Sequence, residues 1–197
     1  MPKIVDKEQM RQTIFDASIS AFTIDGFHNT TMEKIAKKAG IAKGTLYLYF
    51  KSKDELIVSI TDQYFEKLKK KLIPLTLFNT TDSFLSHIET SLLVNEDESK
   101  FIPVFFEVFG PSFSSPKFRK KYDDFFKEVS DFYVENLESL QNSGSINTKL
   151  KPQSLGRVLV SMIDGVVLHK GLFQIEDSSY KQMTTEMINL LDCAWSR

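Results

Sequence analysis

A short stretch of the chain, residues 43–53, gathers side chains that suit contact with a nucleic acid. Lysine ammonium groups bind phosphate oxygens, and threonine and tyrosine hydroxyls bind phosphate oxygens or base edges. A glycine at position 44 would let the backbone approach a duplex closely. The stretch therefore predicts DNA binding. The side chains that carry this prediction are Lys43, Thr45, Tyr47, Tyr49 and Lys53.

Residues for catalysis or metal binding do not gather in this way. The chain has one cysteine, Cys193, and three scattered histidines, which give neither a metal-ligand cluster nor a paired nucleophile. The sequence contains no P-loop, no dinucleotide-binding glycine motif and no nucleophile elbow. We therefore expect no enzyme activity, no metal and no cofactor. For Cys193, in its apolar surroundings, we expect a buried packing position.

The candidate DNA-contacting residues need a rigid support, and the residues before them predict one. Ile35-Ala36, Ala39-Gly40-Ile41 and Thr45-Leu46 have the spacing of a helix-turn-helix. Ala36 is small enough for two helices to cross closely, and Gly40 allows the positive φ of a tight turn. The second helix of the pair would present the base-reading face.

The remaining patterns predict an all-α chain of about nine helices. Apolar residues recur at helical spacing over roughly residues 6–24, and Gly26 is expected to end that helix. Capping boxes at Thr30 with Glu33, and at Ser52 with Glu55, predict two further helix starts. Other helices are expected at about residues 43–50, 81–95, 98–110 (interrupted by Pro103) and 116–142 (capped by Ser115), and from Pro152 and Ser179.

The charge divides the chain into a basic front and an acidic remainder. Residues 1–53 carry nine Lys and Arg residues against five acidic ones, and the rest carries 16 against 21. This asymmetry is typical of a chain whose front segment meets a polyanion. We expect a DNA-binding domain at 1–53 and a helical ligand-binding and dimerisation domain at 54–197, joined by a continuous fourth helix. Because no long apolar run or signal peptide is visible, we expect a cytoplasmic location.

The segment from Gly26 to Lys53 resembles the TetR family of bacterial transcription regulators, most specifically in its Lys-Gly-Thr-Leu-Tyr-Leu-Tyr-Phe run. The resemblance covers roughly the first 56 residues and implies an N-terminal three-helix DNA-binding domain. It implies phosphate contacts from Thr31, Lys43, Tyr47 and Lys53, and groove contacts from Ala42, Gly44, Thr45, Leu48 and Tyr49. Ala42 replaces a common hydroxyl residue, and Leu48 replaces a common aromatic or polar one. An alternative place for Tyr47 is the core.

The last two predicted helices, about 152–172 and 179–195, carry wide apolar stripes. The resemblance implies that they form a four-helix interface in a homodimer, and the alternative is that they close the core of one chain. A dimer also suits DNA reading, because it places two recognition helices ~34–36 Å or somewhat more apart. Gly165, inside the first of these helices, is expected to permit close helix approach.

Nine of the 17 phenylalanines lie between Phe101 and Phe132. Such a group is often plain core, but together these rings also suit a pocket for a small apolar or aromatic effector. The polar groups of this pocket could come from His87, Tyr122, Tyr133, Asp164 or His169. We expect a repressor that an effector releases from its operator. The alternatives are an activator and a regulator controlled by a protein partner. The expected ligand-binding residues are Phe105, Phe109, Phe113, Tyr122, Phe126 and His169.

Overall fold

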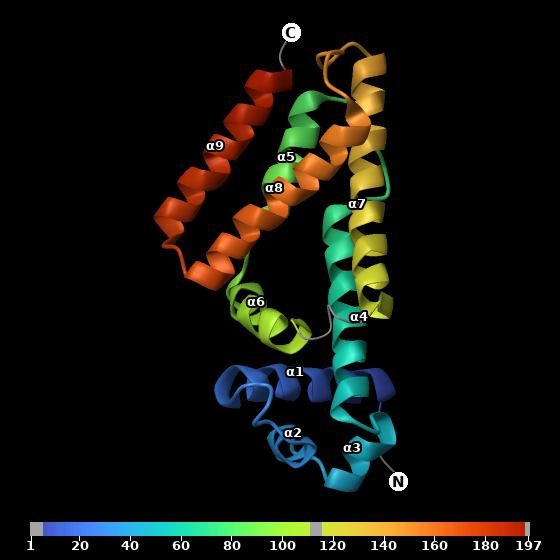
Figure 1. Ribbon diagram of the computed structural model, residues 1–197, viewed down its shortest axis with the longest axis vertical. Coiled ribbons are helices and arrows are strands. Elements are labelled where there is room, and N and C mark those ends of the chain that lie inside the picture. Colours follow the sequence, from blue (N-terminus) through green and yellow to red (C-terminus); the bar gives the residue numbers. More distant parts are fainter. Residues whose placement is uncertain (1–5, 111–115, 196–197) are drawn as a thin grey trace. The chain divides into compact units, whose positions relative to one another are not determined.

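The structure is a computed structural model that describes residues 6–110 and 116–195. Within these residues the chain forms nine α-helices and no strand, which confirms the all-α prediction (Figure 1). The helices are α1 (Lys7–Asp25), α2 (Met32–Lys38), α3 (Lys43–Tyr49), α4 (Lys53–Leu72), α5 (Thr81–Ser91), α6 (Glu96–Phe109), α7 (Pro116–Asn142), α8 (Pro152–Phe173) and α9 (Asp177–Trp195).

The described chain divides into two compact units. The N-terminal unit contains α1, α2, α3, α4 through Glu66, and α6 from Lys100 onward. The C-terminal unit contains residues 67–99 and the described residues from Pro116 onward. Two helices, α4 and α6, therefore contribute residues to both units, and α4 is continuous across the division after Glu66, which lies 13 residues beyond the boundary expected at residue 53.

The N-terminal unit is built on a small apolar core beneath α1, α2 and α3. The side chains of Ile14, Ile35 and Leu46 are fully buried, one from each of these helices. Phe50 and Leu56 close the core after α3 and at the start of α4. Burial of these apolar side chains is the main force that holds the three helices together, and α2 and α3, with seven residues each, are too short to be stable alone.

The ends of α1 and α2 follow from local side-chain chemistry. Asp6 caps α1 by accepting a hydrogen bond from the Glu8 N–H, and Gly26 ends it with a φ of 75°, as expected. The predicted capping role of Thr30 is wrong by one residue. Thr31 caps α2, accepting from the Lys34 N–H, whereas the buried Thr30 hydroxyl donates to the Gly26 carbonyl at 2.7 Å. Thr30 thus ties the end of α1 to the start of α2.

The predicted cap of α4 by Ser52 is confirmed, and the reciprocal bond of Glu55 reaches one residue further back than in a capping box. The Glu55 N–H donates to Ser52 Oγ at 3.1 Å, and the Glu55 carboxylate accepts from the Lys51 N–H at 2.8 Å. Further along the chain, α6 runs through Pro103 without ending there. The last helix begins at Asp177, two residues before the predicted cap at Ser179. The predicted cap Ser115 lies outside the described residues.

In the C-terminal unit, α7 packs along α8, and α9 packs against both α5 and α8. Its core contains the stacked rings of Phe84 and Trp195, with centroids 5.4 Å apart, and the buried Tyr133. The close contact of α7 and α8 is at Gly156, where a Cβ atom would lie 2.8 Å from the Ser130 carbonyl oxygen. The expected role of Gly165 in close approach is wrong within the described chain, since a Cβ there would meet nothing within 4 Å.

Candidate DNA-binding surface and ligand pocket

The helix-turn-helix geometry arises at the turn between α2 and α3. Gly40 adopts a φ of 69°, a conformation that side chains disfavour, and Gly40 N–H donates to the Lys37 carbonyl at 3.2 Å. The Ile41 N–H reaches back to the Ala36 carbonyl at 3.0 Å. Ala36 itself is buried, as its small size at a helix crossing predicts. The turn therefore fixes the direction of α3 relative to α2.

Helix α3 has one buried face and one exposed face. Leu46 faces the core, and Phe50 follows it there. Leu48 is 84% exposed and Tyr47 39% exposed, so Tyr47 is not the core residue of the alternative interpretation. Thr45 and Tyr49 lie half-buried at the edges. The exposed residues at the start of α3 are Ala42, Lys43 and Gly44.

Gly44 has no packing role within the described chain. A Cβ atom built on it would meet nothing within 4 Å, and its φ is not in the left-handed region. A glycine inside a helix costs roughly 0.5–1 kcal/mol relative to alanine, because its backbone loses more conformational freedom. Within the described chain, neither a lack of space nor the backbone conformation requires a glycine at position 44. Close approach of an outside molecule to the α3 backbone would account for it.

Lys43 is positioned by an ion pair across the helix-turn-helix. Its ammonium group contacts the carboxylate of Glu33 on α2. The hydrogen bond between the two raises the pKa of Lys43 and lowers the pKa of Glu33. The Lys43 ammonium also lies 5.8 Å from the centre of the Tyr47 ring. The lysine is therefore exposed and charged, but partly neutralised by its neighbour.

Lys53 occupies a more enclosed position than a simple phosphate-contacting lysine. Its ammonium donates to the Phe27 carbonyl at 2.8 Å and to the Thr30 carbonyl at 3.0 Å, and lies 4.0 Å from the centre of the Phe27 ring. Lys53 thus ties the first turn of α4 to the loop between α1 and α2. An ammonium group has three donors, so one is left for a phosphate.

One further residue at this loop, Glu107, has no signal in the sequence. Its carboxylate accepts a hydrogen bond from the Phe27 N–H at 2.8 Å, and the same oxygen is 3.1 Å from where a Gly26 Cβ would lie. The Phe27 residue is therefore held at its N–H by α6 and at its carbonyl by α4. A contact between residues 80 positions apart has no periodic pattern that could reveal it.

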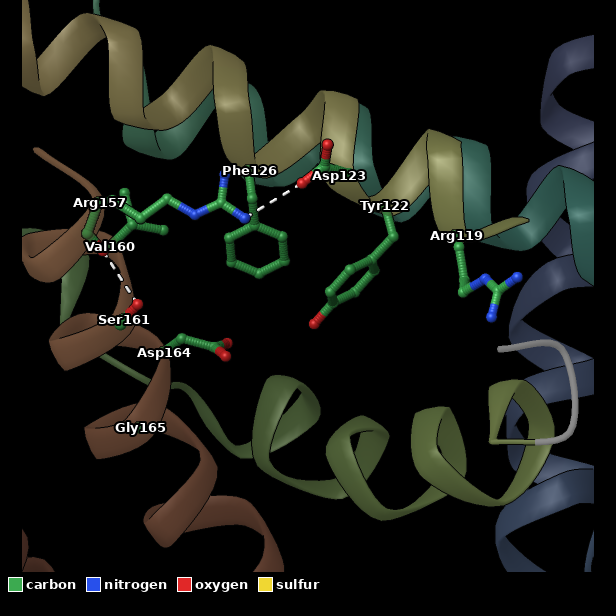
Figure 2. A pocket seen from close by; sticks show the side chains of 9 residues that line it. All are labelled: Arg119, Tyr122, Asp123, Phe126, Arg157, Val160, Ser161, Asp164 and Gly165. Carbon is green, nitrogen blue, oxygen red and sulfur yellow. Dashed lines mark hydrogen bonds and ion pairs between the residues drawn. The ribbon is translucent and has the colours of Figure 1, made fainter. Parts of the chain in front are cut away.

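A pocket of about 300 Å³ lies between α7 and α8 in the C-terminal unit (Figure 2). Its polar groups come from both helices. On one side Arg157 pairs with Asp123 at 3.1 Å, and on the other the rings of Tyr122 and Phe126 lie with centroids 4.6 Å apart. The lining residues are Arg119, Tyr122, Asp123, Phe126, Arg157, Val160, Ser161, Asp164 and Gly165.

Asp164 is the unusual group in this pocket. Burial raises the pKa of its carboxyl above the ordinary aspartate value. Figure 2 shows its side chain directed into the hollow, toward the side of Tyr122. Among the described residues, no hydrogen-bond donor or cation pairs with it, whereas Asp123 is paired with Arg157. A desolvated carboxylate without a partner is costly in a folded protein.

The structure places the predicted ligand-binding residues in different environments. Tyr122 and Phe126 line the pocket. Phe105 lies in the N-terminal unit, buried with Tyr64 and Phe65, and His169 is exposed beside the Phe173 ring. Phe113 and the side chain of Phe109 lie outside the described residues.

The other polar side chains considered for the pocket belong to the core or its edge. His87 lies with its Nε2 atom 3.1 Å from the Leu72 carbonyl oxygen, and burial lowers its pKa. Tyr133 is fully buried, and burial raises its pKa to about 12. Both rings pack on Phe132. They are therefore parts of an aromatic cluster apart from the α7–α8 pocket.

An apolar surface remains on α8 and α9. The exposed residues include Val158 and Phe173 on α8 and Leu190 on α9, with Phe173 and Leu190 each 65% exposed. Cys193 is exposed on α9, so the expected buried position is wrong. Single exposed apolar residues are ordinary, but several large ones on two neighbouring helices are typical of an interaction surface.

The described residues hold neither a metal cluster nor a helix that could span a membrane. No group of three or more His, Cys, Asp or Glu side chains is placed to hold a metal ion there. In the same part of the chain, no helix is both long and apolar enough to cross a membrane.

Comparison with known proteins agrees with the helix-turn-helix found in the N-terminal segment. Residues 14–60 match the family described as bacterial regulatory proteins, tetR family. Over 189 residues the chain is 25% identical to the uncharacterized HTH-type transcriptional regulator YdgC of Bacillus subtilis, covering 93% of this chain and 91% of that protein.

Solved structures extend the likeness to the whole fold. A TetR transcription regulator from Haloarcula marismortui superposes with a TM-score of 0.80 at 14% identity, covering 96% of this chain and 100% of that one. A transcriptional regulator from Saccharomonospora viridis in complex with choline gives a TM-score of 0.77 at 18% identity, covering 94% and 97%. Residues 14–60, which contain the helix-turn-helix, thus match the DNA-binding domain of the tetR family, and the whole described fold is like that of solved TetR-family regulators.

Proposed function

We propose that this protein is a repressor that binds operator DNA as a homodimer and leaves it when a small molecule occupies the α7–α8 pocket. The observation that carries the DNA-binding surface is the exposed face of α3, with Gly44 open to an approaching backbone. In this proposal residues 1–53 form the DNA-binding domain and residues 54–197 sense the ligand and dimerise. The protein acts by binding and not by catalysis.

The α3 face has the chemistry for both kinds of DNA contact. Lys43, Tyr47 and Thr31 supply a charge and hydroxyls for phosphates, and Lys53 supplies its remaining donor. Leu48, the most exposed apolar residue of the helix, suits the methyl group of a thymine. Backbone contact at Ala42 and Gly44, and the edges of Thr45 and Tyr49, complete the proposed surface.

Dimerisation through α8 and α9 is supported by their exposed apolar residues. A single α3 of seven residues reads few base pairs, so a two-fold partner is needed for a specific operator. Burying Phe173 and Leu190 in such an interface would also remove two large apolar side chains from water.

Release by a ligand requires that the pocket favours one state of the protein over another. Helices α4 and α6 are suited to carry this preference, because both contribute residues to both units and both bind Phe27 beside the helix-turn-helix. A change in either helix would alter the support of the loop that leads into α2.

The test begins with selection of a binding site from random double-stranded DNA, followed by fluorescence anisotropy titrations at several salt concentrations. We expect salt-dependent binding by a dimer, and loss of at least about tenfold in affinity for Tyr47→Ala. Lys149→Ala removes an exposed charge from the C-terminal unit and serves as the matched control. Absence of salt-dependent binding to any selected fragment would contradict the proposal.

Repression and activation are separated by a transcription assay on a promoter that contains the selected site. A repressor lowers transcript yield in proportion to site occupancy, whereas an activator raises it. A higher yield on occupied promoters would replace the repressor assignment with the activator.

A further inference from the structure

The α7–α8 pocket contains a negative charge that the described chain does not neutralise. The Asp164 carboxylate lies half-buried in the pocket wall and has no hydrogen-bonding or ionic partner among the described residues. Burying an ionised carboxylate without a partner costs free energy, which a bound cation would offset. An unpaired acid in a ligand-sized pocket is therefore a feature that favours a positively charged occupant.

The two arginines of the pocket do not supply that partner. Arg157 uses its guanidinium on Asp123, with 3.1 Å between Nη2 and the carboxylate oxygen. Arg119 is exposed near the start of α7, and Figure 2 shows its guanidinium directed away from Asp164. Each positive group is thus either committed to another carboxylate or turned toward the far end of the pocket.

The wall opposite Asp164 provides the second element of a cation site. Tyr122 and Phe126 lie one helical turn apart on α7, with ring centroids 4.6 Å from each other. In Figure 2 both rings project from α7 into the space that Asp164 faces from α8. The faces of aromatic rings attract cations, more strongly when the site is partly desolvated. The same rings and Val160 offer contact to an apolar body.

Other ligand charges fit these groups less well. An anion would be repelled by Asp164, and it could recruit Arg157 only by breaking the pair with Asp123. A neutral apolar molecule would displace water from Asp164 and leave the carboxylate without any compensation.

We propose that the pocket between α7 and α8 selects an organic cation, an amine or quaternary ammonium with an apolar body, which Asp164 binds by charge and the rings of Tyr122 and Phe126 enclose. This inference rests on the proposed ligand-sensing function and names its ligand class. It adds a positive charge to the small apolar or aromatic effector that the phenylalanine-rich sequence favours.

The test uses the full-length protein without DNA and three small probes that share a benzyl group. Isothermal titration calorimetry compares benzyltrimethylammonium with benzyl alcohol and phenylacetate. We expect the cation to bind at least about tenfold more tightly than the alcohol or the anion. Asp164→Asn keeps the shape of the side chain and removes its charge. This variant should bind the cation about tenfold more weakly and bind the alcohol with unchanged affinity.

Glu135→Gln is the matched control, because it removes the same kind of charge from an exposed position of α7 that does not line the pocket. Cation affinity should change less than about twofold in this variant. Thermal melts of both variants establish that they are folded. Tighter binding of phenylacetate, absence of cation binding, or equal cation affinity in Asp164→Asn would overturn the inference.

The same probes are then added to the protein–DNA complex, which separates this inference from the proposed function. If the cation binds through Asp164 but leaves the DNA complex intact, the ligand class stands and the sensing role fails. If only the anion binds and displaces DNA, the sensing role stands and the ligand class is wrong.

Discussion

The Phe27 N–H donates a hydrogen bond of 2.8 Å to the Glu107 carboxylate, across 80 residues of sequence. This bond joins α6 to the loop that leads into the helix-turn-helix. Because Lys53 holds the carbonyl of the same residue, two separate helices share one point of attachment. The loop's geometry is therefore set from both sides, and each attachment can be removed without touching α3.

Replacement of Glu107 by alanine should loosen this loop. The loss of one hydrogen bond to a charged acceptor predicts a fall of about 1–2 kcal/mol in the free energy of unfolding, reduced by the exposure of the site. The Phe27 amide should exchange its hydrogen faster, which hydrogen-exchange mass spectrometry or NMR measures. Glu107→Gln, which keeps an oxygen acceptor, should restore much of the protection. Equal exchange in all three proteins would show that the bond has no structural effect.

Gly44→Ala should separate stability from DNA binding. Since a Cβ at this position meets nothing within 4 Å, the helix should gain about 0.5–1 kcal/mol of stability from the better helix former. Operator affinity should fall by at least about tenfold, because the added methyl group prevents close approach of the backbone. Urea denaturation and anisotropy titration measure the two effects. A variant that gains stability and keeps full affinity would remove Gly44 from the proposed interface.

The ion pair between Lys43 and Glu33 predicts opposite effects of neutralising its two members. Lys43→Ala should lower DNA affinity and reduce the salt slope by about 1, because one phosphate contact is lost. Glu33→Gln should raise affinity, since it removes a negative charge and frees the lysine. Titrations at several salt concentrations distinguish the two. A fall in affinity for Glu33→Gln would mean that the pair is needed to position Lys43.

The pH dependence of the free energy of unfolding should reveal the raised pKa of Asp164. At low pH the carboxyl is protonated in both the folded and the unfolded chain. As pH rises through the ordinary aspartate value of 3.8, the unfolded chain loses the proton first, so stability falls until the raised pKa of the folded group is passed. Asp164→Asn should therefore be more stable than the wild type at neutral pH, and this difference should disappear at acidic pH. Urea denaturation over a pH series measures it, and a constant difference would argue against ionisation.

Much of the fold follows from local sequence patterns. Gly26 and Gly40 adopt the positive φ that their places after a helix and within a turn predict, and Ser52 caps α4 as expected. These features depend on residues within a few positions of one another. The N-cap of α2 was misplaced because Thr30 and Thr31 are adjacent and equally suited to cap. Tertiary packing decides between them by burying Thr30.

The pocket was harder to predict than the DNA-binding surface. Periodic spacing identified phenylalanines, but it could not tell that Phe105 packs beside Tyr64 while Phe126 lines a cavity, since both are aromatic residues of helices. The pairing of Asp123 with Arg157, which leaves Asp164 alone, depends on how α7 and α8 lie together. Glu107 was missed for the same reason.

At Gly156, the two helices that form the walls of the cavity come into close contact. There the backbones of α7 and α8 come so close that a methyl group would strike the Ser130 carbonyl oxygen, and the cavity-lining part of α8 begins with the very next residue. The distance between α7 and α8 beside the cavity is therefore set by the absence of a side chain at position 156. A bulkier residue there would push the two helices apart and change the width of the cavity.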